Sequence, residues 1–302
     1  MTGAPGPTPL VVGVIGPGRA GLGLALALAR AGHDLRLYGR RAKPVPAPLT
    51  LTTGPADAAP PWIAAVAVLI LAVPDDAISP LAGILARGRS IRADQVVLHL
   101  SGLLGHEALA ALLPCGAALG SLHPLQTLIE PEVAPDHLRG AWAAVEGMPR
   151  AVTMATRLAQ DVGLRAFPLR AEDKPRYHAG AVFASNYFVV VEALAQELLQ
   201  SAGLEAADAW RALAPLVRGT FDNLQRDGPR GALTGPVARG DAETVARHLA
   251  ALGPEVRELY RRLGEAALDV MGSGRLDAAA VTRVKQALAT APRPVPPPVR
   301  RS

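Results

Sequence analysis

The sequence predicts an α/β fold in which a doubly wound parallel sheet is followed by a domain made only of helices. Short runs of β-forming residues alternate with Ala- and Leu-rich segments from residue 10 to 170. Such alternation is typical of a parallel sheet with helices on both faces. From 171 to 290 the apolar residues recur at helical spacing. We expect two domains with these limits, which meet at the polar segment Arg170–Asp173, and disordered tails at 1–9 and 291–302.

The composition fits a globular chain without disulfides. The 302 residues are 50% hydrophobic, which suits one large or two ordinary domains. The single cysteine, Cys115, cannot form an intramolecular disulfide, and we interpret it as core filling rather than as a nucleophile. The longest uncharged apolar run, Trp62–Pro74, is shorter than the ~20 residues that span a bilayer. We therefore expect a cytoplasmic protein with no membrane partner.

The charge of the chain is positive, with a net value of +5 and an isoelectric point of about 9.9. Such a balance can indicate nucleic-acid binding. The arginines, however, are spread singly along the expected helices among acidic residues, and the basic cluster Arg293–Arg301 is mixed with prolines. We expect no nucleic-acid partner. We attribute the positive net charge to a positive electrostatic field around a site for an anionic ligand and an acidic substrate.

A glycine-rich turn follows the first expected strand, Leu10–Ile15, and precedes an Ala/Leu-rich helix that ends at Ala31. In a GxGxxG turn the first glycine permits the tight turn, the second lets a pyrophosphate approach bare backbone, and the third allows close helix–strand packing. The helix N-terminus favours the anion. We predict dinucleotide binding here, with a structural glycine turn as the alternative. The predicted contacts are Gly16, Pro17, Gly18, Arg19, Ala20 and Gly21.

The end of the second strand, His33–Tyr38, indicates which dinucleotide is bound. An NAD site usually has an acidic residue here, and an NADP site has a nearby arginine for the 2′-phosphate. In this chain Arg40 and Arg41 follow the strand and no carboxylate does. Because a guanidinium can hold a phosphate through two N–H groups, we predict NADP rather than NAD. The alternative is a solvated arginine pair.

The remaining strands of the sheet are short and apolar. We expect them at Leu49–Thr53, Val66–Val73, Val96–Leu100, Ala117–Leu122, Ala141–Val145 and Leu164–Leu169, with helices from Asp75 or Asp76 as N-cap to about Arg87, at about His106–Leu113 and at about Pro149–Val162. Ligands of such sheets lie beyond the carboxyl ends of the strands. The strand-end candidates are Gly16, Val73, Pro74, Ser101 and His123.

The second half of the chain has helical spacing only. We expect helices at Lys174–Ala202, Ala206–Gln225, Asp241–Leu252, Pro254–Met271 and Asp277–Ala289. The apolar faces after Ala184 are more than one domain easily hides, so we predict a homodimer.

Several stretches resemble known families. The turn GPGRAG and the strand LILAVPDDAI are similar to the NADP-binding halves of pyrroline-5-carboxylate reductase, the β-hydroxyacid dehydrogenases and ketopantoate reductase. The stretches SLHPLQT, KPRYHAGAVFASNY and LTGPVARGD resemble Rossmann-like proteins with a helical C-terminal domain of unknown function 2520. This resemblance implies an NADP-binding Rossmann-like domain, a helical substrate and dimerisation domain, and an oxidoreductase activity, and it hardly narrows the substrate.

The best candidates for a proton donor lie at the start of the long helix. Lys174 and His178 are one turn apart on one face, Ser185 lies near the same stripe, and Asn186 sits further round. Desolvation can lower the pKa of a lysine enough for acid–base catalysis. The resemblance to β-hydroxyacid dehydrogenases and ketopantoate reductases implies this role for Lys174, but Pro175 places it at the helix start, so His178 is an equal candidate. The alternative is a capping lysine beside a half-buried histidine.

Other polar residues are candidates for binding the substrate. His123, with Gln126 and Thr127 beside it, would contact the substrate or the nicotinamide, or else only a loop. Ser101 and Gly102 could offer backbone N–H groups, whereas we interpret His99 as a satisfied core histidine. Arg239 would hold a carboxylate or lie solvated before an N-cap at Asp241. The histidines show no metal-ligand spacing, so no metal is predicted.

These observations predict an NADP-dependent oxidoreductase that transfers a hydride to a small keto acid or a cyclic imine carboxylate. Lys174 or His178 would donate the proton, and ketopantoate is the second choice of substrate. The alternative is a non-catalytic NADP-binding sensor or scaffold protein. The polar set of Lys174, His178, Ser185 and His123 argues against that alternative, because a pure binder would not require it.

Overall fold

The computed structural model describes residues 8–290, and the chain divides into two compact units, Met1–Phe188 and Val189–Ser302. The predicted tails lie outside the described residues, except for Thr8 and Pro9. The sequence predicts a boundary at 170, whereas the compact units meet between Phe188 and Val189. The difference arises because the first helix after the sheet packs on the sheet through Lys174 and Tyr177.

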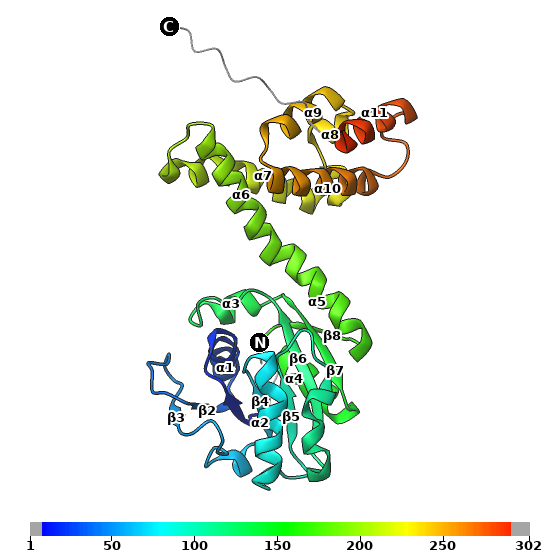
Figure 1. Ribbon diagram of the computed structural model, residues 1–302. Helices are drawn as coiled ribbons and strands as arrows, with labels where there is room; N and C mark the ends of the chain where they lie inside the picture. Colours follow the sequence, from blue (N-terminus) through cyan, green and yellow to red (C-terminus); the bar gives the residue numbers. More distant parts are fainter. Residues whose placement is uncertain (1–7, 291–302) are drawn as a thin grey trace, which may run out of the picture. The chain divides into compact units, whose positions relative to one another are not determined.

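Within the described residues, the first unit contains an eight-stranded sheet of order β3-β2-β1-β4-β5-β6-β7-β8 (Figure 1). The strands are β1 Val11–Ile15, β2 Asp34–Gly39, β3 Leu51–Thr53, β4 Val68–Leu71, β5 Val96–His99, β6 Ala118–Leu125, β7 Trp142–Gly147 and β8 Arg165–Pro168. All neighbours are parallel except β6 and β7. The predicted α/β fold is confirmed, and the antiparallel pair is a departure from the all-parallel expectation.

Helices cover both faces of the sheet. One core holds α1 (Arg19–Arg30) and α4 (Pro149–Asp161), and the other holds α2 (Asp75–Arg87) and the 3₁₀ helix η2 (His106–Cys115). The side chains of β4 alternate between the two cores and are all buried, as expected for a central strand covered on both sides. The shorter elements of this unit are η1 Ile63–Ala65, α3 Ala134–Leu138 and η3 Ala171–Asp173.

The helix expected at about His106–Leu113 is present as the 3₁₀ helix η2. One local prediction in this unit was wrong. The N-cap of α2 is Pro74, and Asp75 is already its first residue. The carboxylate of Asp75 makes no cap because it accepts a hydrogen bond from Ser101 Oγ at 2.8 Å. Asp75 therefore ties α2 to the end of β5.

The chain leaves the sheet through a continuous helical run. This run consists of α5 (Lys174–Val182), a π-helical segment (Phe183–Tyr187) and α6 (Phe188–Ser201). Segments of π-helix often occur at functional sites. Among the described residues, Ala171–Ser201 is the one helix long and apolar enough to cross a membrane. The mean hydropathy is 1.3 over an 18-residue window of it, which is weak evidence for a span. The apolar run considered in the sequence did not reveal it, because a few charged residues interrupt this helix.

The second unit is helical, as predicted. After α6 it contains α7 (Ala206–Ala232), α8 (Gly235–Arg239), α9 (Ala242–Ala251), α10 (Pro254–Met271) and α11 (Ala278–Ala289). Helix α7 extends beyond the expected end because a second helical segment follows a kink at Gly228, where φ is 67°. The expected loop before Asp241 contains the short helix α8.

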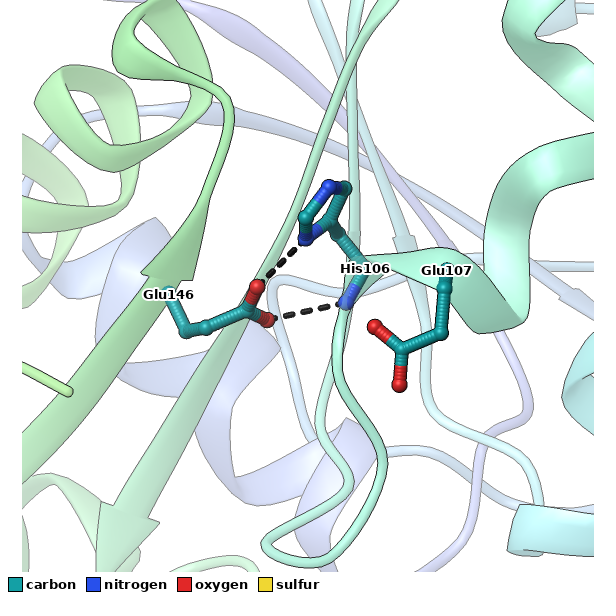
Figure 2. Close-up of side chains that lie close together, drawn as sticks. All are labelled: His106, Glu107 and Glu146. Carbon is teal, nitrogen blue, oxygen red and sulfur yellow. Dashed lines mark hydrogen bonds and ion pairs between the residues drawn. The ribbon is translucent and has the colours of Figure 1, made fainter. Parts of the chain in front are cut away.

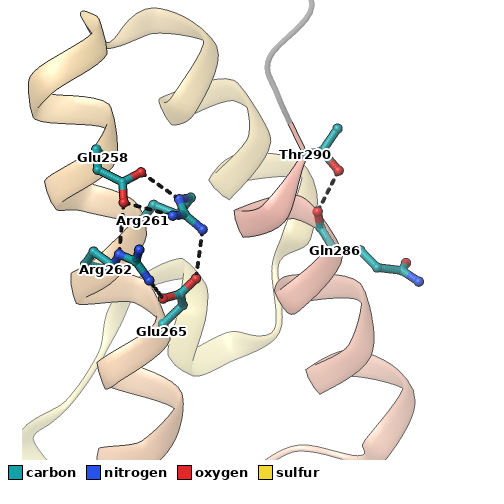
Figure 3. Close-up of polar contacts among 6 residues, drawn as sticks. All are labelled: Glu258, Arg261, Arg262, Glu265, Gln286 and Thr290. Atoms are coloured by element: carbon teal, nitrogen blue, oxygen red, sulfur yellow. Dashed lines mark hydrogen bonds and ion pairs between the residues drawn. The ribbon is translucent and has the colours of Figure 1, made fainter.

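Polar contacts support the ends and surface of these helices. Asp241 accepts a hydrogen bond from Thr244 N at 3.1 Å, so its capping role is confirmed, and Arg239 is exposed. On α10, two arginines bridge two glutamates along the exposed face, and Thr290 bonds to the carbonyl of Gln286 at the end of α11 (Figure 3). Such exposed pairs each contribute little to stability.

Candidate functional site

The turn between β1 and α1 has the geometry of a phosphate cradle. Gly16 has φ +101°, and a Cβ built there would lie 2.3 Å from the carbonyl oxygen of Ala72. A Cβ at Gly21 would lie 2.2 Å from Gly16 O, whereas a Cβ at Gly18 would meet nothing within 4 Å. The first glycine thus makes the turn, the third allows α1 to pack on it, and the second leaves bare backbone open.

The first turn of α1 carries no competing anion. Gly18 is the N-cap without a side-chain cap, the first turn has no acidic residue, and Arg19 and Ala20 are exposed. Unpaired N–H groups at such an end, together with the helix dipole, favour a phosphate. The residues present therefore fit the diphosphate of a dinucleotide.

The end of β2 lies beside this turn. A Cβ at Gly39 would lie 2.7 Å from Cγ of Pro17, so the next residues, Arg40 and Arg41, leave the sheet next to the turn and are exposed. Lys43 Nζ donates a hydrogen bond to the carbonyl of Pro17. This third cation was missed in the sequence, where no motif marks it. The region can accept a further phosphate beside the diphosphate.

The end of β4 completes the cradle. A Cγ of Val73 lies 3.0 Å from the Cβ position of Gly16, and Pro74 follows it as the N-cap of α2. Since β1 and β4 are parallel neighbours, Val73 and Pro74 lie at the same sheet edge as the turn.

Lys174, the first residue of α5, is completely buried beside the carboxyl end of β5 and the middle of β6. Its Nζ donates to Ser101 O at 3.0 Å and to Ser121 Oγ at 2.8 Å. Burial lowers the pKa of Lys174 to about 8, and the carboxylates of Glu146, Glu107 and Asp75 oppose this shift. A lysine ammonium has three donors, so one remains for another acceptor. This environment suits a proton donor near neutral pH.

Three aromatic side chains surround the backbone at Gly102. His123 Nδ1 lies 2.8 Å from the hydroxyl of Tyr177, and the His123 ring packs edge-on against Tyr177 and His178. A Cβ at Gly102 would lie 2.5 Å from Cδ2 of His178 and 2.8 Å from Nε2 of His123. Burial lowers the pKa of His123 to about 4 and raises that of Tyr177 to about 12. At neutral pH the tyrosine hydroxyl therefore donates to a neutral imidazole, and His123 Nε2 carries the remaining proton.

The structure thus brings Lys174, His178, His123 and Gly102 to one sheet edge, but it uses Ser101 differently. The hydroxyl of Ser101 donates to Asp75 and accepts from the amides of Leu103 and Leu104. Its carbonyl, not its hydroxyl, meets Lys174. His99 is buried between Gly105 O and Ser101 N, and burial lowers its pKa to about 4, so the interpretation as a satisfied core histidine is confirmed.

The other candidates make no hydrogen bond to this group among the described residues. Gln126 is exposed and bonds to Thr127 N and His137 O. Ser185 is half-buried and Asn186 exposed in the π-helical segment, and neither side chain makes a hydrogen bond within residues 8–290. Cys115, expected in a core, is half-buried.

A further polar cluster lies next to Lys174 and was missed in the sequence. Figure 2 shows His106, Glu107 and Glu146, whose potential ligand atoms lie within 4.8 Å of one another. Glu146 stands opposite Ser121 in the antiparallel pairing of β6 and β7. No sequence spacing predicts this cluster, because Glu146 on β7 and His106 at the start of η2 are 40 residues apart and meet only in the fold.

Two family models match the chain. Residues 3–124 match the model of a Rossmann-like domain, and residues 141–267 match that of the domain of unknown function 2520. No curated protein matches.

Solved structures share the fold. A candidate NADP oxidoreductase from Bacteroides fragilis is 22% identical, with a TM-score of 0.70 over 86% of this chain and 98% of that one. A Thermotoga maritima protein is also 22% identical, with a TM-score of 0.63 over 88% and 100%. Pyrroline carboxylate reductase from Plasmodium falciparum, with NADP bound, is 12% identical, with a TM-score of 0.56 over 93% and 98%.

Proposed function

Because the chain joins a Rossmann-like domain to the domain of unknown function 2520, we propose that it is an NADP-dependent oxidoreductase acting on a small keto acid or a cyclic imine carboxylate. The observation that carries the proposal is the buried Lys174, whose amine lies at the same edge of the sheet as the phosphate cradle. The NADP in the structurally similar pyrroline carboxylate reductase supports the choice of cofactor.

The cofactor, when bound, supplies the hydride. The amides of the turn Gly16–Gly21 hold the diphosphate, and Val73 and Pro74 line the path toward the nicotinamide. Arg40 and Arg41, with Lys43 behind them, hold the 2′-phosphate, because guanidinium groups bind phosphate through paired N–H donors. Arg40, Arg41 and Lys43 are exposed, and no acidic residue directly follows β2 that could compete with the phosphate for them.

Lys174 donates the proton to the carbonyl oxygen or imine nitrogen as the substrate carbon is reduced. Its lowered pKa makes the ammonium a better acid than a free lysine at neutral pH. His178 is the competing donor, because its ring lies against Gly102 at the same edge. The neutral His123 orients the substrate through Nε2–H, and the backbone at Ser101, with Gln126, Ser185 and Asn186, provides further substrate contacts. Within the oxidoreductase proposal, ketopantoate is the second choice of substrate.

We also propose a homodimer formed through the helical unit. Helix α6 has no buried residue. Large apolar side chains are exposed on three of its helices: Phe188, Val189, Val190, Val191 and Leu198 on α6, Trp210, Leu216, Phe221 and Leu224 on α7, and Leu259, Leu263 and Val270 on α10. Large apolar side chains exposed in this number support an interface. A second copy would cover it and would also account for the apolar run Ala171–Ser201 without a membrane.

The test is NADPH oxidation by the purified chain with a panel of keto acids and cyclic imine carboxylates. We expect turnover that Lys174→Ala or His178→Ala abolishes, according to which residue donates the proton. If NADPH raises the melting temperature but no compound is reduced, the chain is the non-catalytic NADP-binding protein that we consider second. If NADPH gives no thermal shift, both proposals fail.

A further inference from the structure

A continuous series of hydrogen bonds leads from Lys174 toward the protein surface. Lys174 Nζ donates to Ser121 Oγ at 2.8 Å, Ser121 Oγ donates to Glu146 Oε2 at 3.3 Å, and Glu146 Oε1 lies 2.5 Å from His106 Nδ1. The contact between His106 and Glu146 is drawn in Figure 2. Lys174 and Ser121 are 0% exposed and Glu146 is 4% exposed, whereas the His106 side chain is 38% exposed. The series therefore joins a buried amine to solvent.

A lysine that gives up a proton in each catalytic cycle must take one back. Lys174 has no surface of its own in contact with water, so the returning proton must pass through neighbouring groups. Glu146 can pass such a proton inward, because both of its carboxylate oxygens take part in the series. Oε1 lies at His106 Nδ1, and Oε2 accepts hydrogen bonds from Ser121 Oγ and from the backbone N of His106. A buried carboxylate is costly unless hydrogen bonds satisfy it, and these contacts do so.

We propose that Ser121, Glu146 and His106 form a proton relay that returns a proton from solvent to Lys174 after each turnover. The proposal rests on the function proposed above, with Lys174 as the proton donor. None of the three relay residues touches the reacting atoms, so each acts through Lys174.

The relay balances as a transfer of one proton. Protonated His106 gives its Nδ1 proton to Glu146 Oε1, so an N–H bond breaks and an O–H bond forms. The carboxyl group turns and gives this proton to Ser121 Oγ, while Ser121 passes its own hydroxyl proton to the neutral Nζ of Lys174. Glu146 is then a carboxylate and Lys174 an ammonium. His106 takes a new proton from water, which completes the cycle.

The other charged groups nearby do not provide a second route. Asp75 bonds to Ser101 Oγ and reaches Lys174 only as a charge. Glu107 accepts from the backbone of Gly105. His99 and His123, whose pKa values burial lowers to about 4, are neutral near pH 7 and face Lys174 without a hydrogen bond to it among the described residues.

A metal ion is the competing occupant of the cluster formed by His106, Glu107 and Glu146. Metal–ligand bonds of about 2.0–2.2 Å on each side would separate a histidine nitrogen from a carboxylate oxygen by more than a hydrogen bond does. Here His106 Nδ1 and Glu146 Oε1 are 2.5 Å apart. This distance leaves room for a shared proton but not for an ion between the two atoms.

The first experiment measures proton exchange and requires no turnover. We expect nitrogen-15 NMR to show that the Nζ protons of Lys174 exchange with water about tenfold more slowly in Glu146→Gln than in the wild type, because the amide cannot carry a proton. Glu107→Gln is the matched control, since it changes a carboxylate of the same cluster outside the relay. Equal exchange rates in the wild type and in Glu146→Gln would overturn the relay.

The second experiment compares the first turnover with steady state, using NADPH and pyrroline-5-carboxylate as the cyclic imine probe. Lys174 starts protonated, so we expect Glu146→Gln and His106→Asn to keep the single-turnover rate while kcat falls about tenfold or more. Added imidazole should restore kcat in His106→Asn, whose position is partly exposed, and the solvent isotope effect on kcat should rise in both variants.

Each other outcome has a distinct meaning. A wild-type chain that never oxidises NADPH with this or any panel compound contradicts the proposed function, and the relay is then judged by the exchange measurement. Equal losses in the first and later turnovers, without imidazole rescue, overturn the relay in favour of a positioning role. Loss of activity with EDTA that Glu107→Gln reproduces overturns it in favour of a metal site. If Glu146→Gln does not fold, His106→Asn decides by the same criteria.

Discussion

The two units of this chain differ in how completely they bury their own apolar surface. The sheet unit has two cores, and the strand β4 between them is fully buried. The helical unit has one smaller core, around Val245 and Val284, and its helix α6 has no buried residue. The comparison shows that the helical unit leaves more of its large apolar side chains exposed, and the proposed homodimer would cover them.

The largest expected effect is at the polar centre of the sheet unit. Lys174→Met should lower kcat/KM about 10²- to 10⁴-fold, because it removes the proton donor while keeping the side-chain volume. The melting temperature should change little, since the loss of a buried charge offsets the two hydrogen bonds that are lost. Lys285→Met on exposed α11 is the control. Unchanged activity in Lys174→Met would assign the proton to another group.

The glycine turn should respond next most strongly. Gly16→Ala places a Cβ 2.3 Å from Ala72 O at a φ of +101°, so we expect a loss of about 1–3 kcal/mol in stability and no measurable NADPH binding. Gly18→Ala meets nothing within 4 Å and should fold normally, while its methyl group blocks the phosphate. Thermal melting with and without NADPH separates the two effects. Normal NADPH binding by both variants would show that this turn is not the cradle.

The pH dependence tests the buried lysine without a substitution. If protonated Lys174 donates the proton, kcat should be constant below about pH 8 and fall tenfold per unit above it. The pH dependence of stability has the opposite sign to that of kcat. Between the lowered pKa of about 8 and the ordinary value of 10.5, the unfolded chain binds more protons, so the free energy of unfolding should rise with pH. Lys174→Met should lose this rise, and a kcat that already falls between about pH 6 and 7 would contradict Lys174 as the donor.

Cofactor choice should show a smaller effect. Arg40→Ala should weaken NADPH binding about tenfold and leave NADH binding unchanged, because a charge-assisted hydrogen bond to the 2′-phosphate is lost. Arg36→Ala, on the same strand but paired with Asp34 at 2.7 Å, is the control. Equal losses for both nucleotides in titration calorimetry would remove the role of Arg40 in phosphate recognition.

Substitutions in the helical unit should have the smallest effect on stability and the clearest effect on the mass of the protein particle in solution. Phe221→Glu or Val190→Glu introduces a charge into the exposed apolar surface and should convert a dimer into a monomer by light scattering, with little loss in the melting temperature of each subunit. Leu113→Glu, on an exposed apolar residue of the sheet unit, should leave the mass unchanged. A wild-type chain that is already monomeric at micromolar concentration would contradict the homodimer proposed for the helical unit.

Local features of the site could be predicted from the sequence. The roles of Gly16, Gly18 and Gly21 follow from a strand, a turn and a helix that are consecutive in the chain. The shared face of Lys174 and His178 follows from helical spacing. Each of these predictions depends on residues only a few positions apart, so the local pattern is sufficient.

The contacts that give these residues their environment could not be predicted in this way. Glu146 reaches Ser121 only through the antiparallel register of β6 and β7, whereas the sequence predicts a parallel sheet. Tyr177 meets His123 because α5 packs on β6, and Lys43 meets Pro17 across a loop. Asp75, expected as a cap, bonds to Ser101 instead. Long-range pairing decides all four, and no local spacing encodes it.

Gly102 fixes one point for any attempt to engineer a new substrate preference. Two imidazole rings leave no room there for even a methyl group, so the floor of the site must remain peptide backbone. Variation aimed at a larger or differently charged substrate belongs instead at the exposed Asn186, whose side chain makes no hydrogen bond within residues 8–290. A mutant library built on this rule would sample recognition without sampling misfolding.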